Sequence, residues 1–127
     1  MRKTSDAGRD MTMDAAAADA FAEDWIAAWN AHDLDRILSH YAPEIVFRSP
    51  VAQARVGDGR VKGVEALRAY WSGALAALND LRFELVDCLK GHECLTVLYR
   101  NHRGQSVAET FEFQADGKVI RSFACYS

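Results

Sequence analysis

The residue best suited to do chemistry is a carboxylate that falls within an apolar strand pattern. In the segment 106–113, SVAETFEF, strand alternation places Glu109 on the same face as Val107, Phe111 and Phe113. An unpaired carboxylate on a buried face is costly, and burial raises its pKa toward the range in which it exchanges protons near neutral pH. Glu109 is therefore the candidate catalytic acid or base.

A second interpretation of Glu109 stays open at this point. This end of the strand could reach the rim of the sheet, where Glu109 would form an ion pair with Arg100 or Arg121. The carboxylate would then have a structural role. The residue pattern alone gives the two interpretations equal weight.

Polar groups on the preceding predicted strand could converge with Glu109. Alternation places Tyr99 and Asn101 on one face together with Val97. A phenol and an amide beside a carboxyl group would supply the few polar contacts that a small-molecule site needs. The basic neighbours of these residues are at least as consistent with a solvated strand end near the Gly104 turn: Arg100, His102 and Arg103.

Metal and cofactor chemistry is not indicated. The four histidines lack metal-ligand spacing: His32, His40, His92 and His102. The three cysteines have no CxxC spacing and lie within apolar strand patterns, where free cysteine behaves as a small hydrophobic residue: Cys88, Cys94 and Cys125. Gly57-Asp58-Gly59 lacks the lysine and serine of a phosphate loop. The sequence predicts no metal and no cofactor.

The composition indicates one small domain. The 127 residues are half hydrophobic and carry a formal net charge of −3, with both signs interspersed. This balance argues against binding to nucleic acid or to an anionic membrane surface, and no apolar segment is long enough to span a membrane. Residues 1–13 are expected to be a disordered leader or to reflect an uncertain start site, and residues 14–127 to form the domain. The default location is cytoplasmic.

The elements that must position these residues fall into two groups. The first half predicts a helix, a short helix stopped by Pro43, a strand, a mobile loop and a third helix, over 14–31, 34–41, 45–49, 51–62 and 64–78. The last third predicts a meander of four strands, over 82–89, 94–101, 106–113 and 119–126. Helices followed by an antiparallel sheet indicate the α+β class.

Two segments carry a resemblance to a known family. AAWNAHDLDRILSHYAPEIVF, followed by GVEALRAYW, resembles the nuclear transport factor 2-like superfamily, and within it the SnoaL-like and ketosteroid-isomerase-like branch. The resemblance extends from Phe21 to the C-terminus. It implies a cone-shaped barrel, in which a strongly curved, mostly antiparallel sheet and three helices enclose a pocket. Many relatives form homodimers through the outer face of the sheet, here the row that includes Leu98, Thr110 and Phe123.

The resemblance also assigns an expected role to Glu109. Glu109 falls at a position that resembles the one where ketosteroid isomerases carry the protonated aspartic acid of their oxyanion hole. The other two isomerase positions differ, because Trp25 replaces a tyrosine donor and Ser49 replaces the aspartate that moves the proton. The usual steroid-isomerase mechanism is therefore not expected.

The resemblance places aromatic and small residues around the cavity. Ser122 and Ala124 lie between larger neighbours and would leave room for a ligand. The candidate ligand-binding residues are Trp25, Trp29, Tyr41, Phe47, Ser49, Trp71, Tyr99, Asn101, Phe111, Ser122 and Tyr126.

The expected function is binding of a small hydrophobic or aromatic molecule. If the protein is an enzyme, it would be a cofactor-free isomerase, cyclase or dehydratase that acts by proton transfer, with Tyr99, Asn101 or Trp25 orienting a carbonyl group. The alternative is a non-catalytic ligand carrier or protein-association module on the same fold.

Overall fold

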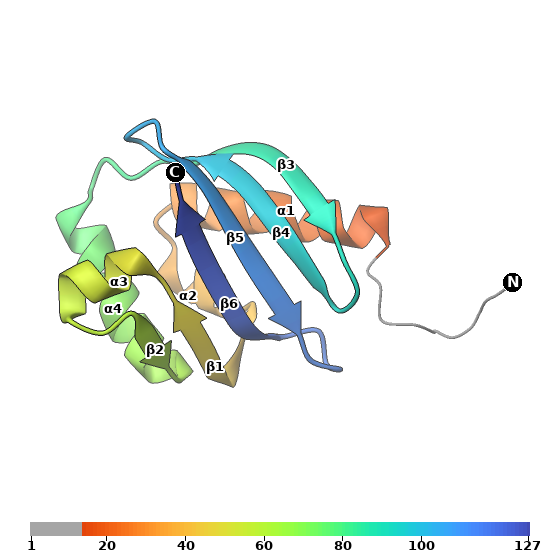
Figure 1. Ribbon diagram of the computed structural model, residues 1–127, viewed down its shortest axis with the longest axis horizontal. Helices are drawn as coiled ribbons and strands as arrows, with labels where there is room; N and C mark the ends of the chain where they lie inside the picture. Colours follow the sequence, from red (N-terminus) through yellow and green to blue (C-terminus); the bar gives the residue numbers. More distant parts are fainter. Residues whose placement is uncertain (1–13) are drawn as a thin grey trace, which may run out of the picture.

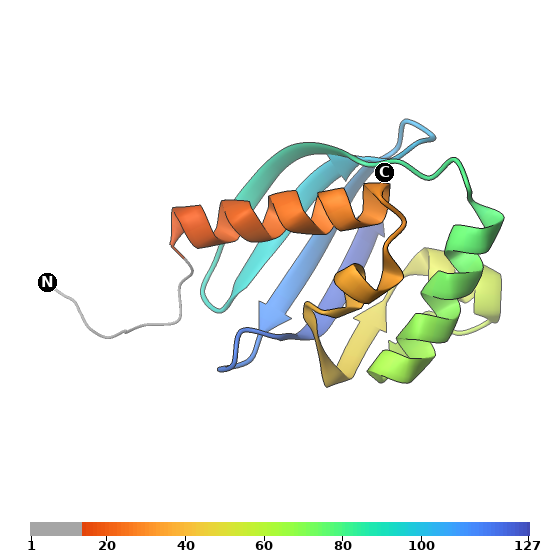
Figure 2. The same cartoon turned by 180° about the vertical axis from the view of Figure 1, so that it is seen from behind.

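Helices cover one face of a single curved sheet. The computed structural model describes residues 14–127, so the predicted leader lies outside the described residues. Six strands form the sheet in the order β2-β1-β6-β5-β4-β3, and the sheet is not closed into a barrel (Figure 1). Seen from behind, α1 crosses the sheet and α4 stands at the other end of the molecule (Figure 2). The α+β prediction is confirmed.

The first helix begins and ends close to the prediction. Helix α1 spans Ala15–Asn30, and the side chain of Asp14 caps it by accepting a hydrogen bond from the backbone N–H of Ala17 at 2.8 Å. Its buried side includes Trp25 and Trp29. This face packs on the sheet and places two indole rings over its concave side.

The region after α1 differs from the prediction. Helix α2 is only five residues long, Leu34–Leu38, and strand β1 already begins at Tyr41, spanning Tyr41–Arg48. Pro43 therefore lies inside β1 and does not stop the helix. It falls where the pairing of β1 with β6 is irregular, between Tyr41 and Val46, and a proline that cannot donate to the ladder is tolerated there.

The prediction of a mobile loop over residues 51–62 is wrong, because a helix and a strand occupy this segment. Helix α3 spans Pro50–Val56 and strand β2 spans Arg60–Lys62. Ser49 caps α3 by accepting a hydrogen bond from Val51 N–H at 3.1 Å, Pro50 occupies the first turn, and Gly57 ends the helix with φ 81°. With α4 at Val64–Ala77, the described residues form four helices rather than three.

The meander of the last third is confirmed. Its strands are β3 Glu84–Lys90, β4 Cys94–Arg100, β5 Ser106–Phe113 and β6 Val119–Tyr126. All neighbouring pairs in the sheet are antiparallel except β1 and β6, which are parallel. Glu109 pairs with Val97 on one side and Ala124 on the other, so it lies well inside the sheet.

The core fills the space between α1, α4 and the concave face. Its aromatic rings meet mainly edge to face, as between Trp25 and Phe111 at 5.1 Å and between Trp29 and Trp71 at 5.0 Å. Cys88 is buried as expected, but Cys125 is exposed, because it lies on the outer face of β6.

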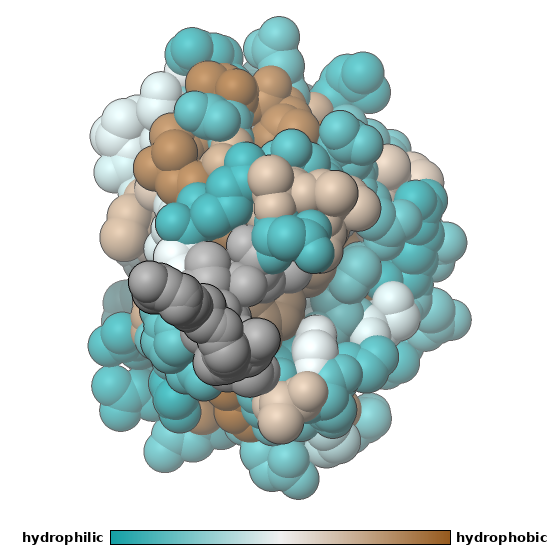
Figure 3. Space-filling view, turned by 90° about the vertical axis from the view of Figure 1, so that its right-hand side faces the viewer, coloured by the Kyte–Doolittle hydropathy of each residue, from teal (hydrophilic) through white to brown (hydrophobic). Residues whose placement is uncertain are grey.

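The surface seen from one side is mainly hydrophilic, with small hydrophobic areas (Figure 3). The large hydrophobic residues that are exposed within 14–127 are Val56, Val86 and Leu89. No helix in this part of the chain combines the length and hydropathy needed to cross a membrane.

Candidate functional site

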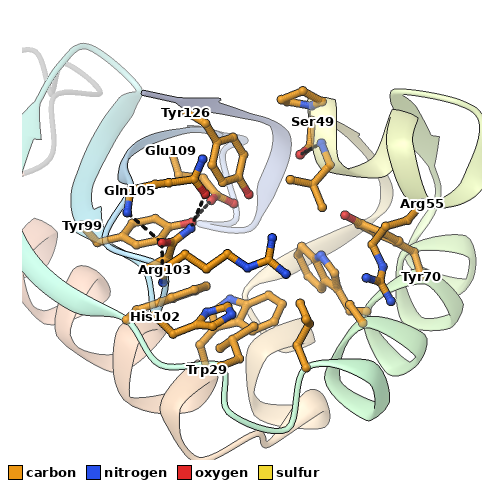
Figure 4. A pocket seen from close by; sticks show the side chains of 18 of the residues that line it. Trp29, Ser49, Arg55, Tyr70, Tyr99, His102, Arg103, Gln105, Glu109 and Tyr126 are labelled. Carbon is orange, nitrogen blue, oxygen red and sulfur yellow. Dashed lines mark hydrogen bonds between the residues drawn. The ribbon is translucent and has the colours of Figure 1, made fainter.

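A cavity of about 470 Å³ opens between the helices and the concave face of the sheet (Figure 4). Ligand sites of small-molecule-binding proteins typically have volumes of about 300–1,000 Å³. Aromatic side chains from helices α1 and α4, from strand β1 and from the segment before β3 form much of its wall: Trp25, Trp29, Phe47, Tyr70, Trp71 and Phe83. The cavity thus offers flat apolar surfaces with a few polar groups between them.

Glu109 lines this cavity as a buried carboxyl group. It is 3 % exposed, and its Oε1 accepts a hydrogen bond from the hydroxyl of Tyr99 at 2.8 Å. Burial raises the pKa of Glu109 from 4.5 to about 8, and the hydrogen bond from Tyr99 offsets part of this rise. At neutral pH the group is therefore mostly the neutral acid, which can donate a proton.

The alternative ion pair of Glu109 does not form. Arg121 instead donates to Glu112 at 2.6 Å on the outer face, and Arg100 is exposed at the end of β4. Within residues 14–127, Glu109 has no salt-bridge partner, and no nearby cation contributes to its pKa.

Three tyrosines stand around Glu109 and stay protonated. Burial, and then the neighbouring Glu109, raises the pKa of Tyr99 well above its ordinary value of 10.0. Burial likewise raises the pKa of Tyr70, to about 12, and that of Tyr126 still further, while Ser49 offsets part of each rise. Each phenol is therefore a hydrogen-bond donor over the physiological pH range.

Nine of the predicted site residues line the cavity, counting the carboxyl group: Trp25, Trp29, Phe47, Ser49, Trp71, Tyr99, Asn101, Glu109 and Tyr126. The other three do not line it: Tyr41, Phe111 and Ser122. Phe111 packs into the core against Phe21 and Trp25, at 5.0 and 5.1 Å between ring centroids. Ser122 and its neighbour Ala124 are buried without forming part of this wall.

Two residues expected to orient a ligand use their polar atoms within the protein. The indole N–H of Trp25 donates to the hydroxyl of the buried Tyr41 at 3.0 Å. The side chain of Asn101 accepts from the backbone N–H groups of Arg103 and Gln105, both at 3.0 Å, and donates to the Gln105 side chain. Asn101 thus shapes the turn between β4 and β5.

Several cavity residues were missed by the sequence interpretation. The predicted loop over 51–62 includes Arg55, although Ser49-Pro50 and Gly57 are helix start and stop signals around it, and Arg55 lines the cavity. For His102 and Arg103 the sequence is at least as consistent with a solvated strand end, whereas both line the cavity in the structure. The turn that carries them contributes to the cavity wall, which residue spacing does not reveal.

Two ring nitrogens on the cavity wall keep unused hydrogen-bonding capacity. Nε1 of Trp29 and Nδ1 of His102 are buried and have no partner among the described residues. The other ring nitrogen of His102, Nε2, lies 3.9 Å from Oδ1 of Asp80. In the same part of the chain, no group of three histidine, cysteine or acidic residues is placed to hold a metal ion.

Comparison with known proteins identifies the family. The sequence matches the model of the SnoaL-like domain over residues 22–122. A SnoaL-like protein of unknown function from Burkholderia thailandensis E264 is 40 % identical, and its crystal structure superposes with a TM-score of 0.89. The alignment covers 91 % of this chain and 98 % of that chain. A search of curated proteins gave no match.

More distant structures share the fold. AclR from Streptomyces galilaeus, described as a candidate hydroxylase, is 23 % identical with a TM-score of 0.70, over 90 % of this chain and 81 % of its own. A candidate isomerase of the SnoaL-like family from Agrobacterium tumefaciens C58 is 17 % identical with a TM-score of 0.69, over 87 % and 97 %. At these identities the likeness shows the fold alone.

Proposed function

The chain belongs to the SnoaL-like family, and from that premise we propose that it binds a small hydrophobic or aromatic carbonyl compound in the cavity. In this proposal Glu109 is the acid that hydrogen-bonds to the carbonyl oxygen of the ligand. The observation that carries the proposal is a buried, neutral carboxyl group without a cationic partner in a cavity lined by aromatic rings.

The hydrogen bond from Tyr99 supports this role of Glu109. Because the Tyr99 hydroxyl donates to Oε1, the proton of the neutral carboxyl group is free to be carried by Oε2. A carboxylic acid held neutral by an apolar site can donate a hydrogen bond to a carbonyl oxygen. It thereby stabilises the negative charge that develops on this oxygen when a base from solvent takes up the proton of a neighbouring C–H group. Isomerisation, cyclisation and dehydration of carbonyl compounds can each proceed through such an enolate without electron transfer.

Descriptions of fold neighbours are in line with this proposal. One is a candidate isomerase and another a candidate hydroxylase, and the structure of TerC was obtained by co-crystallisation with polyporic acid. The alternative is a ligand carrier, in which the same cavity binds the molecule without turnover.

We also propose that two copies of the chain form a homodimer through the outer face of the sheet. Leu98, Thr110 and Phe123 form a half-buried row on this face.

The binding role of Glu109 can be tested with two probes of similar shape, 2-acetylnaphthalene and 2-ethylnaphthalene, which differ in the ketone oxygen. Below pH 8 the wild-type protein is expected to bind the ketone more tightly than 2-ethylnaphthalene. Above pH 8 this preference should fall by about tenfold per pH unit, because Glu109 ionises. In Glu109→Gln the preference should not change with pH, because the amide does not titrate. Equal affinities for both probes in the wild type, or the same pH dependence in the variant, would contradict the proposal.

A second measurement on the bound ketone distinguishes an enzyme that transfers protons from a carrier that only binds the ligand. An enzyme that stabilises the enolate would accelerate exchange of the methyl protons of 2-acetylnaphthalene with deuterium from solvent, as followed by NMR. Glu109→Gln should bind this probe and exchange its protons more slowly. Binding without accelerated exchange in the wild type would favour the carrier.

A further inference from the structure

The charge of the cavity is opposite to the charge of the whole chain. The sequence carries a formal net charge of −3. The cavity wall nevertheless holds two arginines, Arg55 and Arg103, and a single acidic residue, Glu109. Since Glu109 is mostly neutral at pH 7, the wall has a positive charge that no acidic side chain within it balances.

The two arginines approach the cavity from different elements. Arg55 belongs to the last turn of α3, and Arg103 lies in the turn between β4 and β5. Arg103 reaches across the cavity, and Arg55 stands on the opposite side (Figure 4). The backbone of Arg103 is held by Asn101, whose Oδ1 accepts its N–H at 3.0 Å. The positive charge of Arg55 also acts on Tyr70. It favours the ionised form of this phenol and so offsets part of the rise that burial causes in the pKa of Tyr70.

Both guanidinium groups are available for a ligand. Other arginines form ion pairs with carboxylates, as Arg36 does with Asp24 and Arg121 with Glu112. Over residues 14–127, neither Arg55 nor Arg103 has an ion-pair partner or a side-chain hydrogen bond. Both side chains are exposed, whereas Glu109 is buried, so they mark the outer part of the cavity.

We infer that the ligand is an aromatic carbonyl compound that also carries a carboxylate, which Arg55 and Arg103 bind at the mouth of the cavity. This inference rests on the proposed function, because it assumes that the apolar body and the carbonyl group lie deeper, between the aromatic walls and Glu109. The planar guanidinium group donates two parallel hydrogen bonds to a carboxylate, and such charge-assisted bonds are about twice as strong as neutral ones. The ligand thus enters with its ring end first.

The test compares anthraquinone-2-carboxylate with anthraquinone-2-carboxamide, which share the rings and the ketone oxygens but differ in charge. Binding is measured through quenching of tryptophan fluorescence, since Trp25, Trp29 and Trp71 all line the cavity. We expect the wild type to bind the carboxylate at least about tenfold more tightly than the carboxamide. Added salt should weaken only the binding of the carboxylate.

Matched variants assign this preference to the two arginines. Arg55→Gln and Arg103→Gln should each reduce the affinity for the carboxylate several-fold, and the double variant should bind both probes equally. Arg60→Gln makes the same charge change in β2, away from this cavity, and should keep the preference. All three positions are exposed, so the variants are expected to fold.

The outcomes separate this inference from the proposed function. If the carboxamide binds the wild type as tightly as the carboxylate, or if the double variant keeps the preference, the inference is overturned and the aromatic carbonyl site stands. If neither probe binds the wild type, the proposed function is overturned and the inference with it.

Discussion

Replacement of Glu109 by glutamine should stabilise the protein by an amount that grows with pH. In the unfolded chain the carboxyl group ionises with a pKa near 4.5, whereas burial raises its pKa to about 8 in the folded protein. Between these values the unfolded state releases a proton that the folded state keeps. A rise in pH therefore lowers the free energy of unfolding, by about 1.4 kcal/mol per pH unit.

The size of the effect follows from the interval between the two pKa values. Below about pH 4.5 the carboxyl group is protonated in both states and costs nothing, and above about pH 8 it is ionised in both and the cost is complete. The full interval corresponds to about 5 kcal/mol, and the part reached at pH 7 to about 3 kcal/mol. Glutamine has the same shape, and its side-chain oxygen can still accept the hydrogen bond from Tyr99, but it does not titrate.

The assay is urea unfolding of wild type and Glu109→Gln, followed by tryptophan fluorescence at several pH values between about pH 5 and pH 8. The free energy of unfolding of the variant minus that of the wild type should rise steadily over this range. Glu112→Gln removes a carboxylate on the other face of the same strand and serves as the control. A difference that does not change with pH, or that is matched by the control, would refute the reasoning. A wild type that gains relative stability as the pH rises would mean that Glu109 is ionised and paired in the folded state.

Two further variants test the support of the cavity. The side-chain amide of Asn30 connects α1 to the segment before β3, because it donates to the carbonyl of Phe83 at 2.9 Å and accepts from the N–H of Phe83 at 2.7 Å. Asn30→Ala should therefore lower the free energy of unfolding by about 2 kcal/mol. A urea titration that shows no loss of stability would contradict this prediction. Tyr99→Phe removes the hydrogen bond that lowers the pKa of Glu109, so the upper end of the pH window in the unfolding experiment should move above pH 8, and an unchanged window would show that this bond does not act on the carboxyl group.

The burial of Glu109 could be predicted because strand alternation is a local property. The pattern of β5 fixes which side chains share a face, and β5 is buried at Val107, Glu109 and Phe111 as alternation requires. Sharing a face does not determine whether a residue lines a cavity. Phe111 lies two positions from Glu109, but Phe21 from α1 covers it, and this contact joins segments 90 residues apart in the sequence.

Helix α3 was missed because its sequence signal is short. Seven residues give too few turns for an apolar periodicity, and one residue of α3, Ala52, is buried. Its ends do carry helix start and stop residues, Ser49-Pro50 and Gly57, but the Gly57-Asp58-Gly59 turn predicts a loop. Because 51–62 is predicted to be a loop, Arg55 is not among the predicted site residues, although it stands across the cavity from Arg103.

The parallel pairing of β1 with β6 has a consequence for the order of folding. Hairpin contacts join β3, β4, β5 and β6 over short stretches of chain, whereas the partners Phe47 and Ser122 are 75 residues apart. Closing so long a loop costs more entropy, so we expect the meander to form first and β1 to dock later. The cavity needs Phe47 and Ser49 as well as Glu109 and Tyr126, and is therefore complete only after docking. A ligand should accordingly slow unfolding while leaving the folding rate nearly unchanged.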